Sequence, residues 1–201
     1  GRPSQSRYLE GGYLFMPNQL QPGLLGAVLP GIGRAHAELM RQLPKLGGTI
    51  CWIDDVEPGR IRIDGGRRRI EMPLTGGNGE RLRDAWKKQA QLLLAVGAKQ
   101  VLFGDAQDTR IERADQIEAA VRQLSIRPAR NVLGAPHPGG GARMGASPRD
   151  SVVDHEHRVH GFDNLFVADP SVFPSPPSVD PSLTILAFSR VAAAAVAART
   201  S

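Results

Sequence analysis

The spacing of apolar side chains predicts three helices in the first two thirds of the chain. Between Asn78 and Val96, apolar residues recur every three or four positions, which places them on one face of a helix. Gly97 follows as the expected end, because glycine readily adopts the left-handed conformation that terminates many helices. The other two predicted helices cover residues 32–43 and 109–124, and Thr109 is the expected N-cap of the latter.

Alternating apolar and polar positions predict strands between the first two of these helices. The candidates are GGTICWIDDV (47–56), GRIRID (59–64) and RRIEMPL (68–74), followed later by the short run KQVLFG (99–104). Asp64-Gly65-Gly66 is typical of a hairpin turn, and consecutive strands joined by glycine turns favour a β-meander. We therefore expect an α+β arrangement through about residue 128, with helices laid on an antiparallel sheet.

The last third of the chain lacks this periodicity and consists of turns that precede one helix. NLFV (164–167) is expected to form a short buried strand that ends in the turn at Asp169 and Pro170. Asp180 stands before Pro181 and a long apolar run, which predicts an N-cap followed by proline at the first helical position. The start of such a helix presents unpaired backbone N–H groups and the positive end of the helix dipole, so it can bind an anion.

Composition narrows the function classes. The net charge of +5 comes from 21 arginines and 4 lysines that are spread along the chain, so we expect no nucleic-acid partner and interpret Arg67-Arg68-Arg69 as a solvated strand face. A single cysteine, Cys51, fits a reducing compartment, and a cytoplasmic location is expected. No long uninterrupted apolar run is present, which argues against a membrane span.

Two possible ligand-binding motifs are weak on closer inspection. Gly31-Ile32-Gly33 is the nearest approach to a dinucleotide-binding turn, but it lacks the third glycine and a suitable preceding strand. His155, His157 and His160 have spacing that suits a metal, yet a fourth ligand is not evident, so no metal site is expected.

A glycine-rich turn, GAPHPGGGARMG, contains His137, which is the strongest candidate for a catalytic side chain. The ordered elements H137-x-x-G140-x-x-x-M144-G145, SVVD, RVHGFDNLFVADPSVFP and VDPSLTI resemble the C-terminal signature of the glucose-methanol-choline (GMC) flavoprotein oxidoreductases. The resemblance implies that residues 1–128 are a substrate-binding part and that residues 129–201 complete an FAD domain with a strand, a loop and a helix.

The resemblance also implies roles for particular residues. His137 would lie over the flavin ring and act as the base that takes the hydroxyl proton of an alcohol, while hydride passes to flavin N5. The residues implied to contact FAD lie at the strand-end turn and at the helix start: Asp169, Pro170, Asp180, Pro181, Ser182 and Leu183. Backbone N–H groups of Ser182 and Leu183 would face the flavin N1–O2 edge.

Asp180 departs from the family pattern, which usually has Asn or His before the proline. An ionised carboxylate would oppose the negative charge of a reduced flavin. Asp180 therefore pairs with His137 and raises its basicity, carries a proton, or serves as the helix cap; the sequence leaves these alternatives open.

Two functions remain open. The first is the substrate-binding and catalytic portion of an FAD-dependent alcohol dehydrogenase or oxidase, whose partners would be a small alcohol and a missing N-terminal FAD-binding part or subunit. The second is a non-enzymatic module of the same fold that pairs with a separate FAD-binding chain. No G-x-G-x-x-G unit is present, and the chain begins without an initiator Met. We therefore expect a fragment that alone binds FAD weakly or not at all and is inactive.

Overall fold

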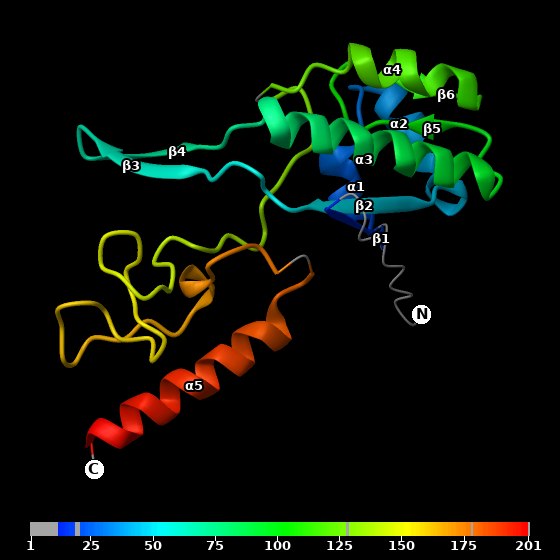
Figure 1. Cartoon of the computed structure of the whole chain (residues 1–201). Helices are drawn as coiled ribbons and strands as arrows, with labels where there is room; N and C mark the ends of the chain where they lie inside the picture. Colours follow the sequence, from blue (N-terminus) through cyan, green and yellow to red (C-terminus); the bar gives the residue numbers. More distant parts are fainter. Residues whose placement is uncertain (1–11, 19–20, 128, 178, 201) are drawn as a thin grey trace. The chain divides into compact units, whose positions relative to one another are not determined.

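The computed structural model describes residues 12–18, 21–127, 129–177 and 179–200. The chain divides into two compact units, Gly1–Leu133 and Gly134–Ser201, and each is described by itself (Figure 1). The described residues form five α-helices and three two-stranded antiparallel sheets. The α+β class is thus confirmed in its general form, but the strands do not make the single sheet that the sequence suggested.

The first unit contains all three sheets and four of the α-helices. Its elements, in chain order, are β1 (Tyr13–Asn18), α1 (Pro22–Val28), α2 (Arg34–Arg41), η1 (Leu43–Lys45), β2 (Gly48–Ile53), β3 (Arg60–Asp64), β4 (Arg67–Glu71), α3 (Gly76–Ala95), β5 (Val101–Leu102), β6 (Arg110–Ile111), η2 (Ala114–Gln116) and α4 (Ile117–Gln123). The expected helices at 32–43 and 78–96 are therefore present with slightly different ends. Gly97 follows α3 with φ of +96°, as a helix-ending glycine should.

The helix α3 organises this unit by packing on two sides (Figure 1). One side meets α4 and the β5–β6 pair in an apolar core formed by Ala90, Val101, Phe103, Ile111, Ile117, Val121 and Leu124. The other side meets β1 and β2, where Tyr13 and Phe15 pack with Ala85. The polar contacts that hold the helix include the Tyr13 hydroxyl, which donates to Asp84 at 2.7 Å, and the Arg83 guanidinium, which donates to the Leu124 carbonyl at 2.8 Å.

The expected β-meander is wrong, because β2 pairs with β1 rather than with β3. The register runs from Tyr13 opposite Ile53 to Asn18 opposite Gly48. The pairing buries the aromatic side of β1 against α3, a gain that the exposed β3–β4 ribbon does not offer β2. Cys51 on β2 lies against this cluster, and burial raises the pKa of its thiol to about 12, so it is an inert packing residue.

The β3–β4 hairpin extends from the base of α3 (Figure 1). Asp64 is opposite Arg67, and the intervening Gly65 and Gly66 have φ of +55° and +76°, which confirms the predicted turn. Every residue of both strands is exposed. The arginines 67–69 are thus on a solvated strand face, and Arg69 pairs with Asp64 at 3.6 Å.

Asn78, near the start of α3, is fully buried and clamps the base of this hairpin. Its side-chain oxygen accepts from the N–H groups of Val56 at 2.6 Å and Glu57 at 3.2 Å. Its amide nitrogen donates to the carbonyls of Glu57 at 3.0 Å and Pro73 at 2.8 Å. One side chain therefore holds both segments that flank the hairpin.

The helix expected from Thr109 begins later than predicted. Arg110 and Ile111 instead pair with β5, and α4 starts at Ile117. Thr109 does not cap a helix, since its N–H and its hydroxyl donate to the buried Asp105 at 2.9 and 2.8 Å. The apolar spacing that predicted the helix is shared by Ile111, which the structure buries as a strand residue.

The second unit has little regular structure besides η3 (Pro170–Val172) and α5 (Ser182–Thr200). The buried strand expected at 164–167 is wrong: Phe166 makes only an isolated bridge with Arg158, and Asn164 and Leu165 are exposed. The core consists of Val153, Val172 and Phe173, with Met144, Val159, Val167, Ile185 and Phe188 packed on it. Four of its eight residues come from turns and loops before η3.

The length and apolar composition of α5 are relevant to the prediction that the chain has no membrane span. Within the described part of the chain it is the one helix long and apolar enough to cross a membrane, over Ser182–Arg199, with a mean hydropathy of 1.4. Only 6% of that window is buried. Length and composition alone are weak evidence, and the absence of a span stays a prediction.

Candidate active site

The glycine-rich turn after His137 runs along η3 and is held there by its backbone. Three N–H groups donate to successive η3 carbonyls: Gly140 to Pro170 at 3.2 Å, Ala142 to Ser171 at 2.9 Å and Met144 to Val172 at 2.8 Å. These three bonds join backbone groups only. The segment is therefore shaped by backbone approach, as its composition predicted.

Within the run Gly139-Gly140-Gly141 of this turn, two positions constrain the residue to glycine. A Cβ on Gly139 would lie 3.0 Å from the Pro170 carbonyl oxygen. Gly140 has φ of +78°, in the left-handed region that favours glycine, and a Cβ there would lie 3.4 Å from the Phe173 carbonyl oxygen. Gly141 meets nothing within 4 Å, so the glycine run contains both constrained and unconstrained members.

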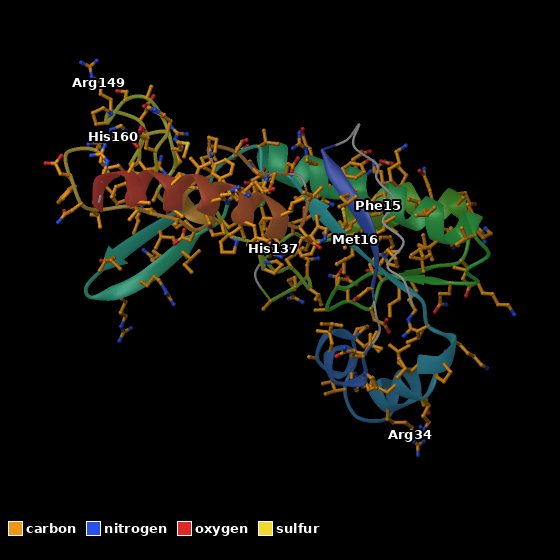
Figure 2. All side chains as sticks on the ribbon, turned by 90° about the horizontal axis from the view of Figure 1, so that it is seen from below. Phe15, Met16, Arg34, His137, Arg149 and His160 are labelled. Atoms are coloured by element: carbon orange, nitrogen blue, oxygen red, sulfur yellow. The ribbon has the colours of Figure 1, made fainter. Side chains whose placement is uncertain are left out.

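His137 and Asp180 are brought together at the start of α5. Their Nδ1 and Oδ1 atoms are 3.7 Å apart, and their side chains are 38% and 40% exposed. In Figure 2 His137 lies by the N-terminal end of α5, whereas Arg149 and His160 lie on loops at a distance from it. The two residues that the sequence named as catalytic candidates are therefore neighbours in the fold, and both remain accessible within this unit.

Asp169 and Pro170 form the start of η3. The Asp169 carboxylate accepts from the Ser171 N–H at 2.8 Å and caps this short helix. Hydrogen bonds from the Ser171 hydroxyl and N–H lower the pKa of the carboxyl below its ordinary value. The side chain is exposed, so a carboxylate is presented at the edge of the turn.

The start of α5 holds the remaining site residues named from the sequence. Pro181 is buried and its carbonyl accepts from the Ile185 N–H at 2.7 Å, which begins the helical ladder. Ser182 and Leu183 lie in the first turn, whose N–H groups have no acceptor within the helix. Leu183 is 80% exposed. The first turn of α5 is therefore exposed at Leu183.

The three clustered histidines have separate partners and do not converge. His155 is exposed, whereas His157 is buried and its Nδ1 lies 2.8 Å from the Val167 carbonyl oxygen. His160 lies 3.0 Å from the Ser151 hydroxyl and 3.2 Å from the Gly145 carbonyl oxygen through Nε2. Over the ranges that the structure describes, no group of three or more His, Cys, Asp and Glu residues could hold a metal ion.

Two contacts of this site were missed by sequence reasoning. The Ser189 hydroxyl on α5 donates to the Ala168 carbonyl at 3.0 Å, which joins the helix to the segment before Asp169. The buried ring of His157 meets Phe188 edge-on, with ring centroids 5.7 Å apart. A serine in an apolar helix and a histidine in a polar run carry no periodic signal that reveals such contacts.

Comparison with known proteins identifies the family. The sequence model described as GMC oxidoreductase, of the C-terminal domain, matches residues 57–189. The chain belongs to the GMC oxidoreductase family. Members of this family are FAD-dependent oxidoreductases.

Individual relatives of the chain are longer proteins. An uncharacterized GMC-type oxidoreductase of Mycobacterium tuberculosis is 31% identical over 88% of this chain and 28% of its own length. A long-chain-alcohol oxidase of Arabidopsis thaliana is 26% identical over 83% of this chain and 24% of its own. The crystal structure of pyridoxine 4-oxidase from Mesorbium loti superposes with a TM-score of 0.51 and 25% identity, over 74% of this chain and 29% of that one. The chain thus spans about a quarter of the length of the proteins it matches.

Proposed function

We propose that this chain is the substrate-binding and C-terminal catalytic part of an FAD-dependent oxidoreductase that oxidises an alcohol. The observation that carries the proposal is the 3.7 Å approach of His137 to Asp180 beside the first turn of α5. It brings a base, a carboxylate and backbone donors together on one accessible side of the unit. The names of two relatives, a long-chain-alcohol oxidase and a pyridoxine 4-oxidase, support the substrate class.

His137 is assigned the acid–base step. Its imidazole accepts the proton from the alcohol oxygen, which leaves the carbon–hydrogen bond of the same carbon ready to lose hydride. The Asp180 carboxylate, whose Oδ1 is 3.7 Å from Nδ1, would face the ring as it takes up this proton. In this proposal Asp180 acts on the base as well as preceding the helix.

The residues around this pair fit a flavin. FAD, when bound, supplies the acceptor for the hydride. The N–H groups of Ser182 and Leu183 lie at the positive end of a 19-residue helix and would donate to the polar edge of the flavin ring, with Pro181 and Asp180 beside them. Asp169 and Pro170 would contact the cofactor from the start of η3.

The proposal also assigns separate functions to the two parts of the chain. We assign residues 1–128 to substrate binding and residues 129–201 to the FAD domain, close to the division of the structure after Leu133. The dinucleotide-binding turn that grips the pyrophosphate is absent from the sequence. An N-terminal FAD-binding part, in the same polypeptide or in a second chain, would supply it.

The second function is a non-enzymatic module that keeps the fold and pairs with a separate FAD-binding chain. The exposed apolar residues of α5, including Leu183 and Leu186, would suit a protein partner in either case. A G-x-G-x-x-G unit encoded upstream in the same reading frame would favour the enzyme. A complete gene for these 201 residues alone would favour the module.

The direct test is anaerobic reduction of the flavin in the complete enzyme by a panel of alcohols. Long-chain, benzylic and hydroxymethyl-pyridine alcohols would be mixed with the enzyme, and loss of the flavin absorbance would be followed. We expect at least one class to bleach the flavin, with oxygen uptake and dye reduction then distinguishing an oxidase from a dehydrogenase. A fully loaded flavoprotein that no alcohol reduces would contradict the proposal.

A further inference from the structure

His157 lies in a tight turn in an uncommon backbone conformation. Its φ is +68°, a region that non-glycine residues seldom occupy and that costs conformational free energy. Asp154 holds the turn, because its carboxylate accepts from the Glu156 N–H at 2.9 Å and the Arg158 N–H at 3.0 Å. The His157 N–H donates to the Asp154 carbonyl at 3.0 Å. The turn thus presents one particular side chain inward at an energetic cost.

That side chain contacts two different segments of the unit. Its ring is 1% exposed, and Nδ1 donates to the Val167 carbonyl at 2.8 Å, since a carbonyl can only accept. The His157 carbonyl in turn accepts from the Val167 N–H at 3.0 Å. On another side the ring meets Phe188 of α5 edge-on at 5.7 Å. Val167 is therefore held by the carbonyl and the Nδ1 of His157, and α5 is contacted by its ring.

Each of these segments leads to one member of the candidate catalytic pair. Val167 continues through Asp169 into η3, whose carbonyls hold the turn that follows His137. Phe188 belongs to α5, which begins directly after Asp180 and Pro181. His157 thus contacts both the segment from Val167 to η3 and helix α5, although it belongs to neither. A displacement at this ring would change the approach of His137 to Asp180.

We propose that His157 is a positioning residue that keeps the η3 segment and α5 in the register that brings His137 next to Asp180. The inference rests on the proposed function, because that pair is the site being positioned. The simple alternative is that His157 only fills space in the core. Phenylalanine would fill that space as well, whereas the bond to the Val167 carbonyl requires an N–H donor at the place of Nδ1.

Two substitutions separate these roles. His157→Phe keeps an aromatic ring for Phe188 but removes the donor to Val167. His157→Asn keeps an amide donor close to the place of Nδ1 and tolerates positive φ, but it removes the ring. His155→Asn, two residues away on the exposed side of the turn, is the matched control. If His157 acts through Val167, asparagine preserves the site and phenylalanine does not.

The readout is the ring of His137, observed by two-dimensional NMR of the nitrogen-15-labelled 201-residue chain. Asp180→Asn defines the ring signals of His137 without its carboxylate neighbour. We expect His157→Phe to move the His137 signals most of the way toward those positions. It should also speed amide exchange of Val167 by about fivefold, because losing the bond to the Val167 carbonyl eases local opening of the N–H bond that Val167 keeps with the His157 carbonyl. His157→Asn and His155→Asn should leave the His137 signals at their wild-type positions.

The outcomes separate the positioning role of His157 from the pairing of His137 with Asp180. Unmoved His137 signals in a folded His157→Phe chain, with a clear response to Asp180→Asn, would overturn the positioning role and leave the pair intact. No response to Asp180→Asn would overturn the pairing and with it the inference. If His157→Phe does not fold by circular dichroism, His157→Asn decides: wild-type His137 signals support the role, and a shift toward the Asp180→Asn positions overturns it.

Discussion

The two units of this chain reach a defined structure by different means. The first unit buries regular helix and strand faces around α3, and its core residues are those that apolar spacing identifies. The second unit has one long helix, and its turns are held by backbone bonds such as Gly140 to Pro170 and by caps such as Asp169. Periodicity therefore explains the first unit, whereas the candidate site is built where periodicity is absent.

This difference decides what the sequence could predict of the fold. The turn at Gly65-Gly66 and the end of α3 at Gly97 followed from local chemistry, because both need positive φ. The partner of β2 did not, since β1 lies 30 residues earlier and carries no alternating signal. The start of α4 was misplaced because Thr109 serves Asp105 rather than a helix. Local rules thus predict elements better than they predict pairings.

For the candidate site, the family resemblance supplied what periodicity could not. It named His137 and Asp180, which are 43 positions apart in the sequence and 3.7 Å apart in the structure. The roles of these residues and of the implied FAD contacts stay predictions. The sequence argues against a metal-binding role for His157 but does not reveal its packing, because neither its buried position nor its positive φ can be read from a polar run of sequence.

The largest stability effect is expected in the first unit, at the buried clamp. Asn78→Ala removes four hydrogen bonds and leaves the N–H and carbonyl groups of Glu57 without that partner. We expect the free energy of unfolding to fall by about 2–4 kcal/mol, in line with buried polar groups left unpaired. Urea unfolding would measure it, with the exposed Gln91→Ala on the same helix as control. A loss no larger than that of the control would show that the hairpin base needs no clamp.

A smaller effect is expected where the second unit depends on backbone approach. Gly140→Val places a β-branched side chain at φ of +78° and 3.4 Å from the Phe173 carbonyl oxygen. Such strain costs about 1–3 kcal/mol. Gly141→Val is the control, since a Cβ at Gly141 meets nothing within 4 Å. Thermal unfolding of the two variants should differ, and equal melting temperatures would mean that the turn does not depend on its conformation at Gly140.

The smallest effect concerns acid sensitivity of the turn that presents His157. Burial alone would raise the pKa of Asp154, but hydrogen bonds from the N–H groups of Arg158 and Glu156 and from the Arg158 side chain lower it overall. A lowered carboxyl pKa gives stability that is present above the ordinary value of about 4 and lost as pH falls through the lowered one.

Asp154→Asn should therefore lessen the loss of stability below about pH 4, by an amount on the order of 1 kcal/mol. Asp163 has a fully exposed carboxyl, so Asp163→Asn is the matched control. It should leave the loss of stability at low pH unchanged. Unfolding measured from pH 2 to 6 tests this. If the free energy of unfolding falls equally with pH in Asp154→Asn and wild type, the turn is not a source of acid sensitivity.

The central claim, that His137 is the base of the site, is tested most directly by rapid-mixing measurement of flavin reduction in the complete enzyme. His137→Ala should retain bound flavin and slow its reduction by about 10²–10⁴-fold, the range for loss of a general base. His155→Ala, which removes an exposed histidine of the same unit, should leave the rate unchanged. A wild-type rate in His137→Ala would contradict the account and favour the non-enzymatic module.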